Sequence, residues 1–364
     1  MNAFRTELQH VHGGPDRLGV PLHDFSSNSN ACGPCPQALA AVQGADASRY
    51  PDASYSNLRA QLAAFHGVDV WRIVLAASAS EFVFRITALA ARQGLQQGPE
   101  RGAPGSVWLP PHGYSDYGVA AQAHGLAVAA DASQASLRWL CEPSSPLGAA
   151  QESFSVPAAG AYRVTVLDRA YEPLRLTGTP SLTDAQLQSL WQLWTPNKAL
   201  GLTGVRAAYA VAPLGAQSDA RVMEMLCPSW PIGAHGVAML QAWTQTEVQA
   251  WLAASLGLLR GWKARQISLC AALGWNALPG DANFFVCDIG IEMCALNSDR
   301  AVDVFSVRDA FQSRSALIKL RSHGIKLRDC ASFGLPGYVR LSVQMPAAQD
   351  ELLKAWQCIT KADA

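Results

Sequence analysis

Residues 164–171 of the 364-residue chain read VTVLDRAY, a short run of apolar and β-branched residues that ends on a carboxylate. Such a run without polar alternation is typical of a strand that is buried on both faces of a sheet. In parallel sheets, ligands gather beyond the carboxyl ends of the strands. Asp168, at the end of this run, and Tyr171, three residues later, are therefore candidate site residues.

Similar short apolar runs recur between residues 55 and 212, and segments with helical periodicity separate them. Continuous apolar strands that alternate with helices predict a mostly parallel sheet covered on both faces, which is a three-layer α/β sandwich. The expected helices are 55–66, 80–93, 114–124 and 183–190, and the expected strands are 73–76, 106–109, 126–130, 137–141, 163–167, 190–194 and 207–212.

After residues 228–231, which read PSWP, the pattern changes to long helical stretches. We expect helices at 236–256, 258–273 and 302–322, strands at 282–288 and 338–343, and a terminal helix from residue 347. The glycine- and proline-rich segment 97–105 is expected to be a surface loop. The sequence predicts a large α/β domain of residues 45–235 and a smaller α+β domain formed by residues 1–44 and 236–364.

The charge balance of the chain favours small-molecule chemistry. Lysine and arginine together number 28, as do aspartate and glutamate, so the net charge is zero. No basic field is available for nucleic acid or an anionic membrane surface. No stretch of about eighteen uncharged apolar residues occurs, and residues 1–12 mix polar and charged side chains. We expect a soluble, cytoplasmic protein.

Nine cysteines are scattered over the chain, a pattern typical of reduced thiols. Cys32-Gly33-Pro34-Cys35 spells the thioredoxin-type redox motif, and a helix could begin at Pro36. The flanking residues predict loops, whereas a redox motif belongs in a compact domain of its own. No second CxxC or histidine pair completes a zinc site, so we expect no metal.

Residues 194–206 read WTPNKALGLTGVR, in which Lys198 is followed by two glycines and then by Arg206. A lysine whose amine can lose its proton can form a Schiff base with an aldehyde cofactor. A cofactor phosphate needs a permanently charged, forked donor such as arginine. The pattern fits both requirements, although a solvated lysine near the start of a helix would also produce it.

Other polar residues follow the expected strands. Thr195, Tyr114 and Ser145 each come after a strand, and residues 78–80 precede a helix, where free amides and the helix dipole favour a phosphate. Simpler interpretations stay open for some of them. Asp168 could merely end a strand, and the two tyrosines Tyr114 and Tyr117 could be core aromatics of one helix.

Taken together, these motifs resemble the fold-type I pyridoxal-phosphate enzymes of the class I/II aminotransferase superfamily. The similarity is greatest to the group of histidinol-phosphate aminotransferase and threonine-phosphate decarboxylase. It runs over nearly the whole chain, from residues 12–14 to 339–343. Its most specific pieces are residues 198–206, 49–52, 168–171 and 282–284, and residues 328–330 leading to Arg340.

The resemblance implies pyridoxal 5′-phosphate as the cofactor. It implies that Lys198 holds the cofactor aldehyde and moves the substrate proton, and that Asp168 pairs with the pyridinium nitrogen. Tyr171 would hydrogen-bond the ring hydroxyl. The other cofactor-binding residues that it implies are Ser78, Ala79, Ser80, Tyr114, Ser145, Thr195 and Arg206.

The resemblance also implies a homodimer, because Tyr50 would reach the phosphate of the neighbouring subunit. Arg340 would bind the substrate carboxylate through a two-pronged ion pair. These roles predict an aminotransferase that acts on a small amino acid and a keto acid, like histidinol-phosphate aminotransferase. The second alternative is decarboxylation of threonine phosphate. The His-Gly-Gly segment of residues 12–14 resembles the threonine-phosphate decarboxylase branch of the family.

Three positions depart from the family pattern. Ser145 stands where the family has an asparagine, Arg169 stands where an acidic residue usually follows the ring aspartate, and residues 76–78 replace a glycine-rich turn. Because of Ser145 and Arg169, a cofactor-binding homologue without catalytic activity is a further alternative.

Overall fold

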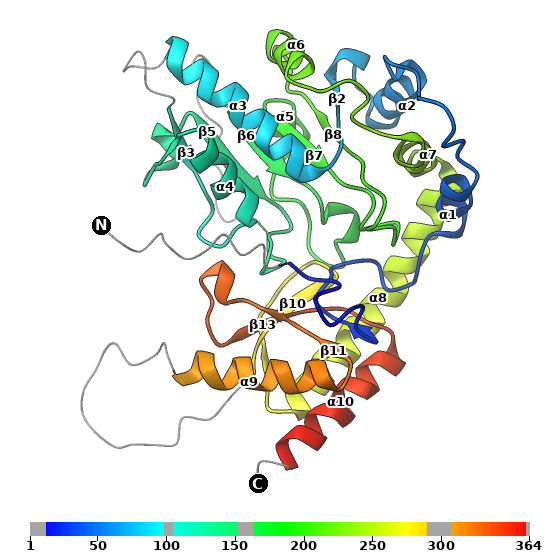
Figure 1. The fold of residues 1–364 in the computed structure, drawn as a ribbon, viewed down its shortest axis with the longest axis vertical. Helices are drawn as coiled ribbons and strands as arrows, with labels where there is room; N and C mark the ends of the chain where they lie inside the picture. The colour runs from blue at the N-terminus through cyan, green and yellow to red at the C-terminus, as the bar shows by residue number, and fades with distance from the viewer. Residues whose placement is uncertain (1–11, 98–104, 151–163, 290–307, 362–364) are drawn as a thin grey trace. The chain divides into compact units, whose positions relative to one another are not determined.

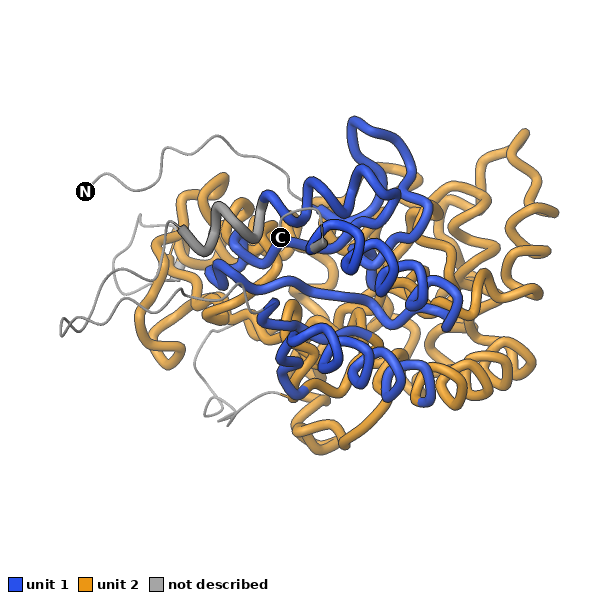
Figure 2. Tube along the Cα trace, turned by 90° about the horizontal axis from the view of Figure 1, so that it is seen from below, with its two compact units in different colours: residues 1–28, 261–279, 284–364 blue, residues 29–260, 280–283 orange. Residues whose placement is uncertain are grey.

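The structure is a computed structural model that describes residues 12–97, 105–150, 164–289 and 308–361. The chain divides into two compact units, which Figure 2 shows in different colours. The larger unit holds residues 29–260 and 280–283, and the smaller unit holds residues 1–28, 261–279 and 284–364. Residues 29–44 and 236–260 thus belong to the larger unit, whereas the domain division expected above assigns them to the smaller domain.

The larger unit is built on a seven-stranded sheet with the order β2-β8-β7-β6-β5-β3-β4. The neighbours from β7 to β4 are parallel, whereas β8 is antiparallel to both β7 and β2. The mostly parallel sheet is therefore confirmed. The strands are β2 (Ile73–Ala76), β3 (Ser106–Trp108), β4 (Ala127–Val128), β5 (Leu137–Cys141), β6 (Val164–Asp168), β7 (Trp191–Trp194) and β8 (Ala208–Val211).

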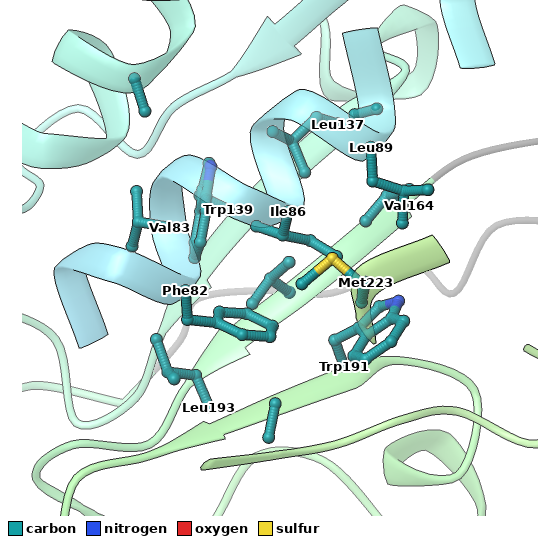
Figure 3. Packing of buried hydrophobic residues seen from close by; sticks show 14 of the residues in the cluster. Phe82, Val83, Ile86, Leu89, Leu137, Trp139, Val164, Trp191, Leu193 and Met223 are labelled. Carbon is teal, nitrogen blue, oxygen red and sulfur yellow. The ribbon is translucent and has the colours of Figure 1, made fainter. Parts of the chain in front are cut away.

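Helices cover both faces of this sheet because its side chains alternate between two apolar layers. On one face, Trp139, Val166 and Leu193 belong to a cluster with α3, α4 and α6, and Figure 3 shows its side chains. On the other face, Leu140 and Leu167 pack with residues of α5 and its flanking segments. Each large apolar side chain that is buried in this way contributes about 1.5–3 kcal/mol. The three-layer α/β architecture is confirmed.

The helices of this unit follow the expected pattern with shifted ends (Figure 1). They are α1 (Pro36–Gln43), α2 (Ser56–His66), α3 (Ala79–Gln97), α4 (Ser115–Ala123), α5 (Asp184–Leu187), α6 (Gln217–Met225), α7 (Ala234–Trp243) and α8 (Thr246–Ala272). Short 3₁₀ helices are η1 (Val70–Arg72), η2 (Ala132–Gln134) and η3 (Glu172–Leu174).

The expected helices at 236–256 and 258–273 are wrong in their division. The helical break lies between α7 and α8, and α8 runs through Gly257 without interruption, with open space beside that glycine. One glycine inside a helix costs only about 1 kcal/mol, which the packing of a 27-residue helix can offset. The expected helix at 183–190 is also shorter, since α5 ends at Leu187.

The smaller unit combines two sheets with helices, as the predicted α+β class requires. β1 (His23–Asp24) pairs in parallel with β11 (Ile325–Lys326). The second sheet has the strand order β12-β13-β10-β9, and all of its neighbouring strands are antiparallel. Its strands are β12 (Arg328–Asp329), β13 (Tyr338–Ser342), β10 (Phe284–Asp288) and β9 (Asn276–Ala277), and the unit also holds η4 (Ala331–Phe333), α9 (Arg308–Ser322), α10 (Pro346–Lys361) and the end of α8.

Two expectations fall on residues outside those described. The expected surface loop at 97–105 overlaps residues 98–104, and the expected helix at 302–322 is described only from Arg308 onward.

Candidate active site

Several predicted site residues of the larger unit lie at the carboxyl ends of its parallel strands. β5, β6 and β7 are parallel, and β2 points the same way because β8 is antiparallel to both of its neighbours. Their carboxyl ends therefore lie on one side, where ligands of α/β sheets bind. Asp168 is the last residue of β6, and Thr195 directly follows β7.

Asp168 is the buried acid of this edge, with 6% of its surface exposed. Its Oδ2 accepts a hydrogen bond from the Tyr117 hydroxyl at 2.7 Å, and its Oδ1 accepts one from the Ala170 backbone N–H at 2.9 Å. Burial raises the pKa of Asp168, while the Tyr117 hydrogen bond and the positive charge of Lys198 act to lower it. A buried carboxylate of this kind is best stabilised by a further proton donor.

Tyr117, to which the resemblance assigns no role, is the side chain that holds Asp168. Its ring stacks on Trp139 at 4.2 Å between centroids and meets the Tyr114 ring edge-on at 5.7 Å. Burial raises the pKa of Tyr117 well above its ordinary value of 10, so the hydroxyl remains a donor. The signal in the sequence was its position one helical turn after Tyr114.

Lys198 lies in the loop after β7, close to three of the predicted site residues. Its Nζ donates a hydrogen bond to Thr195 Oγ1 at 3.2 Å and lies 5.4 Å from the centre of the Tyr171 ring. Its charge lowers the pKa of Asp168, so the amine lies within electrostatic range of that carboxylate. The structure thus brings together Lys198, Asp168, Tyr171 and Thr195.

The N-terminus of α3 supplies unpaired amide donors beside this group. Ser78 Oγ accepts the Glu81 backbone N–H at 3.1 Å, and Glu81 accepts the Ala77 N–H at 3.2 Å. In the described part of the chain, the backbone N–H groups of Ala79 and Ser80 have no acceptor. Ser80 Oγ lies 3.0 Å from the Tyr114 hydroxyl. A phosphate fits such a helix N-terminus.

The remaining predicted residues of the larger unit have different surroundings. Ser145 is buried in the loop after β5, and Arg206 is exposed. Tyr50 is 80% exposed, and its ring stacks on Trp230 at 4.6 Å between centroids. Tyr50 therefore leaves a large aromatic surface open to a partner.

The Cys32–Cys35 motif supports the Lys198 loop. Both cysteines are free thiols. The Asn30 backbone N–H donates to the Lys198 carbonyl at 2.9 Å, and the Cys35 N–H donates to the Leu200 carbonyl at 2.8 Å. These bonds fix the backbone on which Lys198 is carried.

Arg340 lies in the smaller unit, next to a second buried arginine. Its Nη2 donates to the Ser26 carbonyl at 3.0 Å, and its guanidinium carbon lies 5.5 Å from the centre of the Phe284 ring. Arg328 is its partner in the register of β12 and β13. Burial and the charge of Arg340 lower the pKa of Arg328. Two adjacent buried guanidinium groups favour an anionic ligand, a role that the family resemblance implies for Arg340 alone.

The residues at the sheet edge fit pyridoxal phosphate by their chemistry. Asp168 is a buried carboxylate suited to a protonated ring nitrogen, and Lys198 carries a primary amine beside it. The free amides of Ala79 and Ser80 suit a phosphate.

The helices of the described residues include none with the length and apolar character needed to cross a membrane.

Comparisons with known proteins show the family of this chain. Residues 161–355, more than half of the chain, match the family "Aminotransferase class I and II". Histidinol-phosphate aminotransferase 1 of Thiobacillus denitrificans is 28% identical over 376 aligned residues, which cover 93% of this chain and 86% of that protein.

Solved structures share the fold. The histidinol-phosphate aminotransferase of Sinorhizobium meliloti, in complex with pyridoxal 5′-phosphate, superposes with a TM-score of 0.72 at 22% identity, over 93% of this chain and 90% of that one. The L-threonine-O-3-phosphate decarboxylase of Porphyromonas gingivalis superposes with a TM-score of 0.68 at 19% identity, over 93% and 99%. The chain belongs to the class I and II aminotransferase family and is a pyridoxal-phosphate-dependent aminotransferase of fold type I.

Proposed function

We propose that this aminotransferase acts on a small, anionic amino compound of the histidinol-phosphate type and that Lys198 is the residue that holds the cofactor. The observation that carries the proposal is the position of Lys198 Nζ, which donates to Thr195, lies 5.4 Å from the centre of the Tyr171 ring and lowers the pKa of the buried Asp168. The family match supports an active aminotransferase over the alternative of a non-catalytic homologue.

Three residues of the larger unit, Asp168, Lys198 and Thr195, would have distinct roles in the reaction. When bound, pyridoxal phosphate supplies an electron-withdrawing ring that stabilises negative charge on the substrate α carbon. Asp168, held by Tyr117, would keep the ring nitrogen protonated. The Lys198 amine would accept the proton from the substrate α carbon, and Thr195 Oγ1, 3.2 Å away, would orient that amine.

Further cofactor contacts belong to the same proposal. The amides of Ala79 and Ser80 would hold the phosphate, together with Ser78, Thr195 and Arg206. Tyr114 would cover the ring, and Tyr171 and Ser145 would face the ring hydroxyl. Tyr50 would serve the site of a second copy in a cytoplasmic homodimer, and residues 45–235 would form the cofactor-binding domain.

The paired arginines support an anionic substrate. Arg340 and Arg328 are both buried, and each lies near an aromatic ring of the smaller unit. A phosphate accepts hydrogen bonds from two guanidinium groups at once, which neutralises the repulsion between them. This favours a phosphorylated substrate, or one with two acidic groups, over a neutral amino acid.

A second candidate is the decarboxylation of threonine phosphate. The observation in its favour is the placement of the His-Gly-Gly segment of residues 12–14. A Cβ on Gly13 would lie 2.1 Å from the Ser26 carbonyl oxygen, which also accepts the hydrogen bond of Arg340. The segment thus abuts the support of the proposed substrate-binding arginine.

One assay separates the two reactions. The purified holoenzyme is incubated with histidinol phosphate plus 2-oxoglutarate, and separately with threonine phosphate, and both amino transfer and carbon dioxide are measured. We expect amino transfer from histidinol phosphate without release of gas. Carbon dioxide from threonine phosphate, with no amino transfer from histidinol phosphate, would contradict the first proposal and support the second.

A further inference from the structure

A cavity lies in the larger unit, on the sheet face opposite α3. Its volume is about 410 Å³, and Gln192 and Trp194 of β7 form part of its wall. These two residues alternate along the strand with Trp191 and Leu193, which pack in the cluster with α3. The cavity is therefore separated from that cluster by the sheet itself.

Arg169 lines this cavity, at the position where the family usually has an acidic residue. Its side chain is 11% exposed, and its guanidinium lies on the Trp194 ring, 4.5 Å from the centre. Nη1 donates to Gln192 Oε1 at 2.9 Å, and Nη2 is 3.6 Å from Glu172. Within the described residues the bond to Gln192 is its one hydrogen bond, and Glu172 is its ion-pair partner, so the remaining N–H donors are available to a ligand.

His66 contributes a second donor, which follows from a chain of hydrogen bonds. Trp243 Nε1 can only donate, and it donates to the Tyr209 hydroxyl oxygen at 3.1 Å. The Tyr209 proton then has His66 Nε2, at 2.8 Å, as its acceptor. With Nε2 as this acceptor, a neutral His66 carries its proton on Nδ1, which makes that nitrogen a donor on a ring that lines the cavity.

The two glutamines of the wall have side-chain oxygens that already accept hydrogen bonds. Arg72 Nη1 occupies Gln188 Oε1 at 2.6 Å, and Arg169 occupies Gln192 Oε1. The Gln188 amide nitrogen has no acceptor among the described residues. Trp194 Nε1 is also buried without a hydrogen-bond partner there. Gln192 Nε2 donates to the Leu187 carbonyl at 3.1 Å, so the donors of the wall that remain are those of Gln188 and Trp194.

We infer that this cavity binds a small organic carboxylate. The donors of Arg169, His66 and Gln188 match an oxyanion, which only accepts hydrogen bonds. Leu187 and Val211 provide apolar surface for the body of the ligand. Asp184, a carboxylate of the lining, is exposed and can stay hydrated while the ligand binds. This site is separate from the proposed function and does not depend on it.

The test uses the holoenzyme and fluorine NMR of trifluorobutyrate, while the cofactor absorbance is recorded in the same samples. We expect saturable binding that leaves the absorbance unchanged. Arg169→Met removes the charge but keeps an unbranched side chain over Trp194, and it should weaken binding at least about tenfold. Arg92→Met, at an exposed position of α3, is the matched control and should bind as the wild type does.

Gln188→Leu is a second variant, which tests the wall if Arg169→Met fails to fold, and it should also weaken binding. Equal affinity in these variants and in the wild type would overturn the inference. So would a change in cofactor absorbance on binding, or no saturation at millimolar concentrations. Inorganic phosphate is the competing arm: displacement by phosphate at lower concentrations than by unlabelled butyrate would contradict the carboxylate assignment.

Discussion

At Asp168, burial and the surrounding donors and charge act in opposite directions on the pKa of the carboxyl group. Burial raises its pKa, and the Tyr117 hydroxyl, Lys198 and the Ala170 N–H together counter part of that effect. A carboxylate in this state gains from a proton donor placed against it, which is what a pyridinium nitrogen provides. Cofactor affinity and kcat should therefore depend on the groups that keep Asp168 ionised.

Tyr117→Phe tests this dependence. The substitution keeps the ring that stacks on Trp139 and removes the donor at 2.7 Å from Asp168. A hydrogen bond to a charged group is worth about 1.5–3 kcal/mol, so we expect kcat to fall about tenfold or more and cofactor affinity to decrease. Steady-state kinetics and cofactor titration measure both.

The control for this change is Tyr209→Phe, which removes another buried, hydrogen-bonded hydroxyl on the opposite face of the sheet. It should lower stability without a comparable loss of kcat. If Tyr117→Phe retains full activity and cofactor affinity, Tyr117 is a packing residue and nothing more.

His66 predicts a dependence of stability on pH. Burial, followed by the charge of Arg169, lowers its pKa from 6.5 to about 4. Between these values the unfolded chain binds a proton that the folded chain does not, so this contribution is complete above pH 6.5 and is lost as the pH falls toward 4. It amounts to about 3 kcal/mol at most.

His66→Gln lacks this titration but keeps an acceptor for the Tyr209 hydroxyl. Thermal unfolding at pH 7 and pH 4.5 should show the wild type losing more stability than the variant between the two pH values. An equal loss in both proteins would show that His66 is not the titrating group.

At the scale of elements, the Lys198 loop depends on a close backbone contact with residues 30–35. Gly201 has φ +68°, and a Cβ there would lie 2.6 Å from the Gly33 carbonyl oxygen. Only glycine satisfies both conditions without strain. The Cys32–Cys35 motif therefore has a structural use that needs no redox chemistry.

Gly201→Ala should destabilise the protein by about 2–4 kcal/mol, since a left-handed alanine costs about 1–2 kcal/mol and the clash adds to it. It should also reduce cofactor occupancy, because the loop that carries Lys198 must shift. The matched control is Gly204→Ala in the same loop, where nothing lies within 4 Å of the added Cβ. Equal unfolding temperatures and cofactor loading in the two variants would refute this view of the loop.

Elements with a strong apolar pattern were predictable from the sequence. β2 and β5 begin and end at the expected residues because their runs are wholly buried. The division between α7 and α8 was not, since periodicity does not locate a break inside a long apolar helical stretch. The reversed direction of β8 was also hidden, because an apolar run carries no information on strand direction.

The same limit applies to the candidate site. Lys198, Asp168 and Thr195 could be named because each ends or follows a strand, and the parallel sheet brings those strand ends together. The Tyr117–Asp168 hydrogen bond spans 51 residues, and the pairing of Arg328 with Arg340 depends on the register of two strands. Contacts of this kind arise from tertiary packing, which local sequence patterns do not encode.

At the scale of the whole molecule, the proposed homodimer predicts complementation between inactive variants. Tyr50→Ala would impair the neighbour's site, and Lys198→Ala would impair its own. After mixing and subunit exchange, each mixed dimer would have one site that carries both substitutions and one site with Lys198 and Tyr50 intact. Activity should therefore reappear. If the mixture stays as inactive as its components, Tyr50 does not act across subunits.

The account as a whole rests on the claim that Lys198 holds the cofactor, and one measurement tests it most directly. The holoenzyme is reduced with borohydride, digested with a protease, and analysed by mass spectrometry. We predict that the cofactor is attached to the peptide that contains Lys198, at that side chain. Attachment at another lysine, or no attached cofactor on any peptide, would contradict the claim.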